Sequence, residues 1–165
     1  MWWSDRRGVL ALAAGGALSA CGFRPMLAEG EGGEALRGTV VVAEARDPET
    51  YAYRERLRRR LGDPSANAAW RLEYQLRFEE DGVAIEPDSD ITRFQVAAVA
   101  RWRLRPLAGD AEPIEGQVRA AGAYDAASEP FATLSARRAE REEMATELAE
   151  RTASRIFALI AAESS

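Results

Sequence analysis

The stretch WRLEYQLRF, residues 70–78, alternates large apolar side chains with charged or polar ones. A period of two places the apolar residues on one face of a β-strand and the polar residues on the other. The pattern therefore predicts a strand with one buried and one solvent-facing side. The acidic segment Glu79–Gly82 that follows is typical of a turn, with a further short strand predicted at Val83–Ile85.

Three more strands are predicted on either side of this stretch. A β-branched run bounded by glycine predicts a first strand within Gly38–Ala45, and alternation returns at Ile91–Leu104 and, with smaller residues, at Ile114–Tyr124. Short connections between the last three strands favour antiparallel pairing. The connection from the first strand to the second contains a helix and is long enough for a right-handed crossover, which favours a parallel pair.

Two helices accompany these strands. The first begins at Asp47-Pro48, carries Tyr53, Leu57 and Leu61 at intervals of four, and ends before Gly62. The second follows Glu129-Pro130, and its apolar residues form one stripe. The residues of that stripe are Ala145, Leu148, Ala149, Thr152, Ile156, Leu159 and Ile160. We expect an α+β two-layer sandwich, with two helices packed on one face of a mixed four-stranded sheet.

The composition excludes several classes of chemistry. The 165 residues include 22 arginines, no lysine, no histidine and one cysteine, and the net charge is −5. Histidine triads, histidine zinc sites, Walker-type phosphate lysines and internal disulfides are therefore excluded. The acidic balance argues against a nucleic-acid binder. We predict no cofactor and no metal site, which leaves a binding protein or an enzyme that works with carboxylates.

The N-terminus has the layout of a bacterial export signal. Arg6 and Arg7 precede a short apolar segment, and Leu18-Ser19-Ala20-Cys21 resembles a lipobox, in which the cysteine becomes the acylated first residue. The twin arginines leave the export route open, and a plain signal peptide followed by a free thiol is the alternative. We expect a cleaved signal at 1–20, a lipidated N-terminus and flexible tether at 21–37, and a single domain at 38–165.

A family resemblance runs through the predicted mature chain. The segment CGFRP at residues 21–25, the alternating strand at 70–78, ITRFQV at 91–96, the stretch 119–125 and the C-terminal helix resemble the lipopolysaccharide-assembly lipoprotein LptE family in its alphaproteobacterial form. The resemblance implies a non-enzymatic lipoprotein on the periplasmic face of the outer membrane. It also implies two partners, an LptD-like β-barrel and lipopolysaccharide. Such a lipoprotein plugs the barrel and helps it to assemble.

Arginines on the third predicted strand are candidates for ligand binding. Arg101, Arg103 and Arg105 share its polar face, and Arg119 joins them from the fourth strand if the register allows. Guanidinium groups bind phosphate bidentately, and lipid A carries phosphates. The candidate lipopolysaccharide-binding residues are Arg93, Arg101, Arg103 and Arg119. The alternative is an ordinary solvated face, or one that contacts polar groups inside the barrel.

Other charged segments receive simpler interpretations. The arginines of residues 54–60 predict a solvated helix, with anionic headgroups as the alternative ligand. Glu86, Asp88 and Asp90 are typical of a turn rather than of a calcium loop. Two other functions stay open: an auxiliary lipoprotein of a phospholipid ABC transporter, and a membrane-tethered hydrolase with a carboxylate pair.

Overall fold

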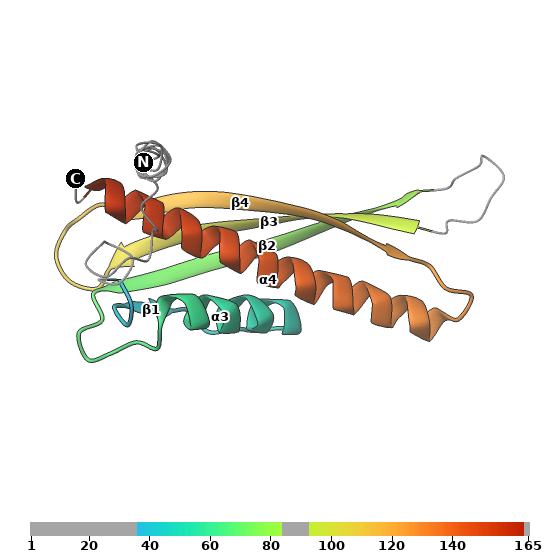
Figure 1. The fold of residues 1–165 in the computed structure, drawn as a ribbon, viewed down its shortest axis with the longest axis horizontal. Helices are drawn as coiled ribbons and strands as arrows, with labels where there is room; N and C mark the ends of the chain where they lie inside the picture. Colours follow the sequence, from blue (N-terminus) through green and yellow to red (C-terminus); the bar gives the residue numbers. More distant parts are fainter. Residues whose placement is uncertain (1–35, 84–92, 164–165) are drawn as a thin grey trace, which may run out of the picture.

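The computed structural model describes residues 36–83 and 93–163, and the side chains among these up to Ile160. The elements follow in the order β1, α3, β2, β3, β4 and α4. Figure 1 shows both helices on the same side of the sheet, with α4 running along its length and α3 beside it at the end where β1 lies. The predicted two-layer α+β sandwich is confirmed. Cys21, the predicted signal peptide and Glu86–Asp90 lie outside the described residues.

The crossover unit at the start of the domain forms as predicted, although its strand is shorter. β1 covers only Val40–Val42, and α3 covers Pro48–Leu61. The Asp47 carboxylate accepts a hydrogen bond from the Thr50 backbone N–H at 2.7 Å, and the Thr50 hydroxyl accepts one from the Asp47 N–H at 3.0 Å, which is a capping box. At the other end Gly62 has φ 81°, a conformation that glycine adopts without strain.

The sheet has the order β1-β2-β3-β4. β2 covers Trp70–Val83, β3 covers Arg93–Pro106 and β4 covers Ile114–Asp125. β1 pairs with β2 in parallel, and the other two pairs are antiparallel, as predicted. Because β2 and β3 pair residue for residue over their whole lengths, even-numbered residues of β2, β3 and β4 share the face toward the helices, and odd-numbered residues share the outer face.

The prediction of a turn at Glu79–Gly82 is wrong, because β2 continues to Val83 and the alternation continues with it. Glu80 consequently points toward the helices. Its carboxylate accepts hydrogen bonds from Arg141 Nε at 2.6 Å, Arg137 Nε at 3.0 Å and the Tyr124 hydroxyl at 3.1 Å. Burial by itself would raise the pKa of Glu80, but these three hydrogen bonds lower it below its ordinary value. The acidic residue belongs in the strand because α4 supplies its counterions.

The long helix α4 covers Pro130–Glu163 and buries the predicted stripe from Ala145 to Ile156, whereas Leu159 and Ile160 are only partly buried. Thr152 is fully buried in that stripe and accepts a hydrogen bond from the Tyr53 hydroxyl at 2.8 Å. Desolvation raises the pKa of Tyr53 well above its ordinary value, so the hydroxyl stays a donor. The arginine-rich face of α3 is less solvated than predicted, because Arg56 and Arg60 both pair with Glu150 of α4.

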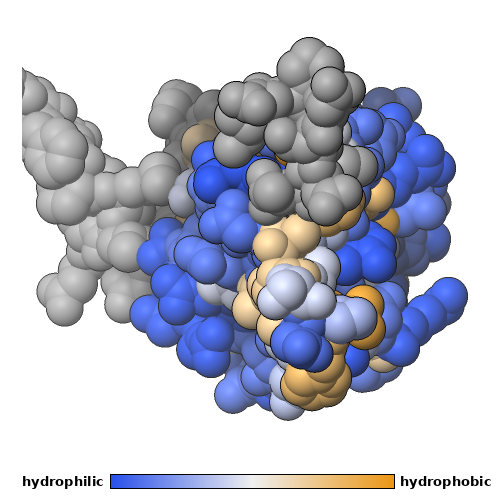
Figure 2. Space-filling model, turned by 90° about the vertical axis from the view of Figure 1, so that its right-hand side faces the viewer, coloured by the Kyte–Doolittle hydropathy of each residue, from blue (hydrophilic) through white to orange (hydrophobic). Residues whose placement is uncertain are grey.

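The end of the molecule at which α4 begins is mostly hydrophilic (Figure 2). Figure 2 looks onto this end and shows a narrow strip of apolar atoms within a polar surface. Exposed apolar residues of this region include Phe131, which is 82% exposed, and Leu134, which is 59% exposed. Among the described residues, no helix has both the length and the apolar character needed to cross a bilayer.

Candidate functional site

The outer face of the sheet is positively charged although the protein is acidic. The odd-numbered residues of β2, β3 and β4 include seven arginines and five carboxylates, and most are exposed. The arginines are Arg71, Arg77, Arg93, Arg101, Arg103, Arg105 and Arg119. The carboxylates are Glu73, Glu79, Asp81, Glu115 and Asp125. A face of this sign attracts anions to a molecule whose net charge repels them.

Several of these arginines already have a carboxylate partner. Arg103 pairs with Glu115 at 2.5 Å, directly across the β3–β4 ladder, and Arg93 pairs with Asp125 at 3.2 Å in the same way. Arg105 lies 3.5 Å from Glu73. The side chains of all three arginines are about half exposed, so each pair contributes about 0–1 kcal/mol to stability. Two predicted ligand residues, Arg93 and Arg103, are thus neutralised by neighbours on the sheet.

Three other arginines surround a small hollow and form what we call the arginine cluster: Arg77, Arg101 and Arg119. The register places Arg77 and Arg119 on either side of Val99. Arg101 follows Val99 by two residues on the same face, so the three side chains form a triangle. The hollow has a volume of about 120 Å³. Its lining consists of Gln75, Arg77, Glu79, Ala97, Val99, Arg101, Gln117 and Arg119.

The arginine cluster forms no ion pairs within the part of the chain that the structure describes. Within residues 36–83 and 93–160, no carboxylate forms an ion pair with Arg77, Arg101 or Arg119. Small side chains at Ala97 and Val99 leave room above the sheet between the longer arginines. The cluster thus offers guanidinium donors around a depression, and Glu79 contributes one negative charge at its edge. Such an arrangement suits a phosphate or another compact anion.

The structure places some of the residues chosen from the sequence together and others apart. Arg101 and Arg119 lie together on the outer face, because the β3–β4 register, which the sequence left open, brings them there. Arg93 lies near the far end of β3, away from them, and Arg103 is occupied by Glu115. Sequence analysis missed Arg77, although it belongs to the polar side of the strand at residues 70–78. Only the β2–β3–β4 register shows that Arg77 flanks Val99 opposite Arg119.

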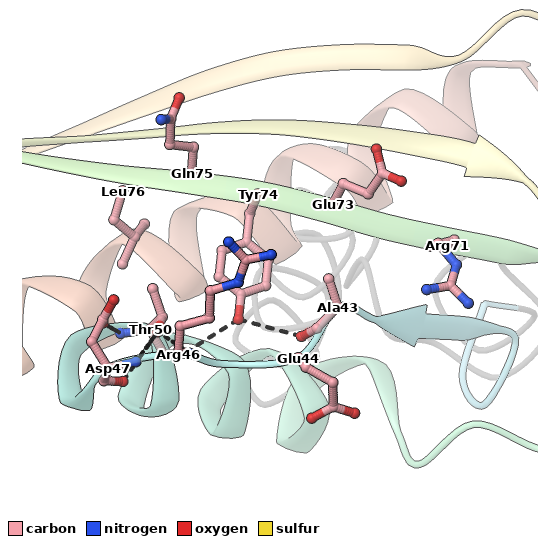
Figure 3. A pocket seen from close by; sticks show the side chains of 10 residues that line it. All are labelled: Ala43, Glu44, Arg46, Asp47, Thr50, Arg71, Glu73, Tyr74, Gln75 and Leu76. Atoms are coloured by element: carbon pink, nitrogen blue, oxygen red, sulfur yellow. Dashed lines mark hydrogen bonds between the residues drawn. The ribbon is translucent and has the colours of Figure 1, made fainter.

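A larger hollow of about 570 Å³ lies at the free edge of β2 (Figure 3). It contains three carboxylates, but each has a structural partner. Asp47 caps α3, Glu44 pairs with Arg54 at 3.1 Å, and Glu73 lies near Arg105. No pair of facing acids is available there for general acid–base chemistry. The hollow therefore gives no support to the carboxylate-hydrolase alternative.

Comparison with known proteins finds similarity at the level of three-dimensional structure. No family model and no curated protein sequence matches the chain. Among solved structures, the chain is similar to one described as a “putative lipoprotein” from Caulobacter crescentus, with a TM-score of 0.61 and 25% identity over 79% of this chain and 96% of that chain. A looser match is rare lipoprotein B from Shewanella oneidensis, with a TM-score of 0.42 and 18% identity over 76% of this chain and 94% of that chain. Another is a minor lipoprotein from Acinetobacter baumannii, with a TM-score of 0.40 and 16% identity over 76% of this chain and 90% of that chain.

Proposed function

We propose that this protein is a non-enzymatic lipoprotein of the outer membrane that binds lipopolysaccharide through the arginine cluster while assisting its assembly into the membrane. The observation that carries the proposal is the arginine cluster, which has no ion-pair partner among the described residues and surrounds a hollow on the exposed sheet face. Lipid A phosphates have the charge and the geometry that guanidinium groups bind. The likeness to the Caulobacter crescentus structure described as a “putative lipoprotein” supports the anchoring part of the proposal.

The proposed anchor is Cys21, acylated after removal of residues 1–20. Cys21 precedes Leu36 by fifteen residues, and a chain of that length spans at most about 50 Å. Leu36 lies beside the C-terminal end of α3, since Gly38 N–H donates to Leu61 C=O at 2.8 Å and Thr39 N–H to Leu36 C=O at 3.1 Å. The anchor therefore leads to the end of the domain at which β1 and β2 begin.

The proposed protein partner is an LptD-like β-barrel. The interior of an outer-membrane barrel is polar, and a domain that sits inside it needs a polar exterior. The outer sheet face, with its mixture of arginines and carboxylates, meets that requirement. A barrel lumen that leaves the arginine cluster uncovered would let the same domain bind the barrel and a phosphate at once.

The test compares lipopolysaccharide binding by the acylated full-length protein in detergent. The triple variant Arg77→Glu/Arg101→Glu/Arg119→Glu should bind at least tenfold more weakly than the unaltered protein. The matched control is Arg59→Glu/Arg138→Glu/Arg155→Glu, which makes the same change in net charge at exposed positions on the helices. We expect the control to change binding less than twofold. Equal losses in both variants would show a general charge effect and contradict the assignment.

Two further measurements separate the alternatives. Lipopolysaccharide whose phosphates have been removed should lose most of its affinity for the unaltered protein, because the guanidinium partners are then absent. Phosphatidylglycerol vesicles, in contrast, should bind weakly, since a phosphodiester carries a single charge. If the protein binds the vesicles more strongly than it binds lipopolysaccharide, the result would favour the alternative function, an auxiliary lipoprotein of a phospholipid transporter. Mass spectrometry of the native protein should show acylated Cys21, and Cys21→Ser should release the protein from membranes.

A further inference from the structure

One long edge of the sheet is left open by the shortness of β1. β1 pairs with β2 only from Trp70 to Leu72, so Glu73–Val83 has β3 on one side and no strand on the other among the described residues. Figure 3 shows β1 ending beside the labelled Ala43, just after its last residue Val42, while β2 runs on. This edge has no bulge, because β2 pairs with β3 at every residue, and the sequence of β2 contains no proline. Natural proteins use both devices to block strand addition.

The backbone of β2 shows which groups the edge offers. Trp70 N–H donates to Thr39 C=O at 3.1 Å, and Leu72 C=O accepts from Ala43 N–H at 2.9 Å, so even-numbered residues direct their N–H and C=O groups toward the β1 side. Beyond Leu72 the same groups belong to Tyr74, Leu76, Phe78 and Glu80. Along the edge, the N–H donors and C=O acceptors of these residues have the spacing that an extended strand needs for backbone hydrogen bonding.

The opposite edge of the sheet has a side-chain donor at one position. On β4 the Arg119 C=O accepts a hydrogen bond from the Arg151 guanidinium of α4. On β2 the chain instead turns away from the edge after Ala43. The Tyr74 hydroxyl holds the departing segment by donating to Ala43 C=O at 3.3 Å and Thr50 C=O at 3.4 Å. The hollow of about 570 Å³ lies where the next residues of a longer β1 would lie.

We propose that the β2 edge from Tyr74 to Gly82 accepts an extended segment of another protein, as an added strand in line with β1. Side chains of the edge define the chemistry of that segment. Leu76 and Phe78 are half-buried apolar residues on the helix side, and Glu79 and Asp81 are exposed on the outer side with no ion-pair partner in the described part of the chain. The segment therefore alternates apolar residues with basic ones.

Two other occupants fit the edge less well. The protein's own residues 22–35 carry Glu29, Glu31 and Glu34, which repel Glu79 and Asp81. A second copy pairs favourably only if Arg77 faces Glu79 of the partner subunit. That antiparallel register also sets the apolar Val83 opposite the charged Glu73 of the partner subunit, and Leu72 of the partner subunit, the next residue, already pairs with β1. A different polypeptide has neither difficulty.

The test uses the amides of β2 in the full-length protein, measured residue by residue by hydrogen exchange. The probe is a nine-residue peptide of alternating valine and arginine, and the control peptide replaces each arginine with glutamate. Without peptide, the amides of Leu76, Phe78 and Glu80 should exchange fast, while those of Gln75 and Arg77, which bond to β3, exchange slowly. The arginine peptide should slow the first group at least tenfold and leave the second unchanged.

Variants make the test independent of any single peptide. Glu79→Arg/Asp81→Arg should weaken binding of the arginine peptide about tenfold and strengthen binding of the glutamate peptide. Asp110→Arg/Glu112→Arg, the same charge change in the exposed β3–β4 connection, should leave both unchanged. Leu76→Pro, which removes an outward N–H, should abolish binding of the arginine peptide. Absence of slowing, or equal binding by the two charge variants, would overturn the proposal. Protection of the same amides that rises with protein concentration alone would overturn it in favour of a second copy.

Discussion

The two faces of the sheet are made by alternate residues of the same strands, yet they treat charge in opposite ways. The inner face carries one charged residue in the described strands, Glu80, and α4 surrounds it with Arg137 and Arg141. The outer face carries seven arginines, and four of them, Arg71 and the three of the arginine cluster, have no ion-pair partner within the described part of the chain. A charge with a complete set of partners serves stability, whereas a charge without them is available to a ligand.

The largest expected effect is on the packing of the inner face. A Cβ at Gly116 would lie 2.6 Å from Cε2 of the buried Trp102 ring, whereas a Cβ at Gly122 would meet the flexible end of Glu140. We expect Gly116→Ala to lower the free energy of unfolding by about 3 kcal/mol and Gly122→Ala to change it by less than about 0.5 kcal/mol. Urea denaturation of both variants checks this. Equal values would show that the Trp102 ring moves freely.

The next effect concerns Glu80. Glu80→Gln removes the charge that two arginines and Tyr124 contact, and we expect a loss of about 2 kcal/mol at pH 7. Glu79→Gln, one residue away on the outer face, is the matched control and should cost less than about 0.5 kcal/mol. Chemical denaturation of the two variants measures the contrast directly. A similar loss in both would remove the distinction between the two faces.

The same residue predicts a pH dependence. Because the pKa of Glu80 is lowered on folding, its contribution is present above the unfolded glutamate pKa of about 4.3 and is lost as the pH falls through the folded value. The unaltered protein should therefore lose stability below about pH 4.3 more steeply than Glu80→Gln. Thermal melting from pH 7 to pH 3 tests this. Parallel curves for the two proteins would contradict the assignment.

A smaller effect is expected in the helix layer over the inner face. Tyr53→Phe leaves the Thr152 hydroxyl buried without its donor, at a cost of about 1.5 kcal/mol. Adding Thr152→Val removes the second polar group, so the double variant should be more stable than Tyr53→Phe alone. Denaturation of the three variants completes a double-mutant cycle. Additive losses would mean that the two hydroxyls do not interact.

The smallest effect on stability is expected at the arginine cluster. Arg77→Gln, Arg101→Gln and Arg119→Gln should each change the free energy of unfolding by less than about 0.5 kcal/mol, because none of these side chains has an ion-pair partner among the described residues. Each should nonetheless weaken lipopolysaccharide binding. Calorimetric unfolding and binding assays on the same samples separate the two quantities. A destabilised variant would assign the cluster a structural role.

Local patterns account for most of the fold. Alternation at residues 70–78 and the stripe ending at Ile160 predict a strand and a helix, and the Asp47-Pro48 pair predicts where α3 begins. The turn predicted at Glu79–Gly82 is wrong because acidic residues in sequence resemble a turn unless their counterions are known. Those counterions, Arg137 and Arg141, lie 57 and 61 residues away in the chain.

The candidate site depended on distant contacts in the same way. Alternation alone placed Arg101 and Arg103 on one face, but it did not show that Glu115 neutralises one and leaves the other free. Strand type, helix boundaries and the side on which each residue lies follow from periods of 2 and 3.6 residues, which are properties of neighbouring positions. Ion pairing, the grouping of Arg77 with Arg119, and the open edge of β2 follow from strand register and helix placement, which are set only when the whole chain packs.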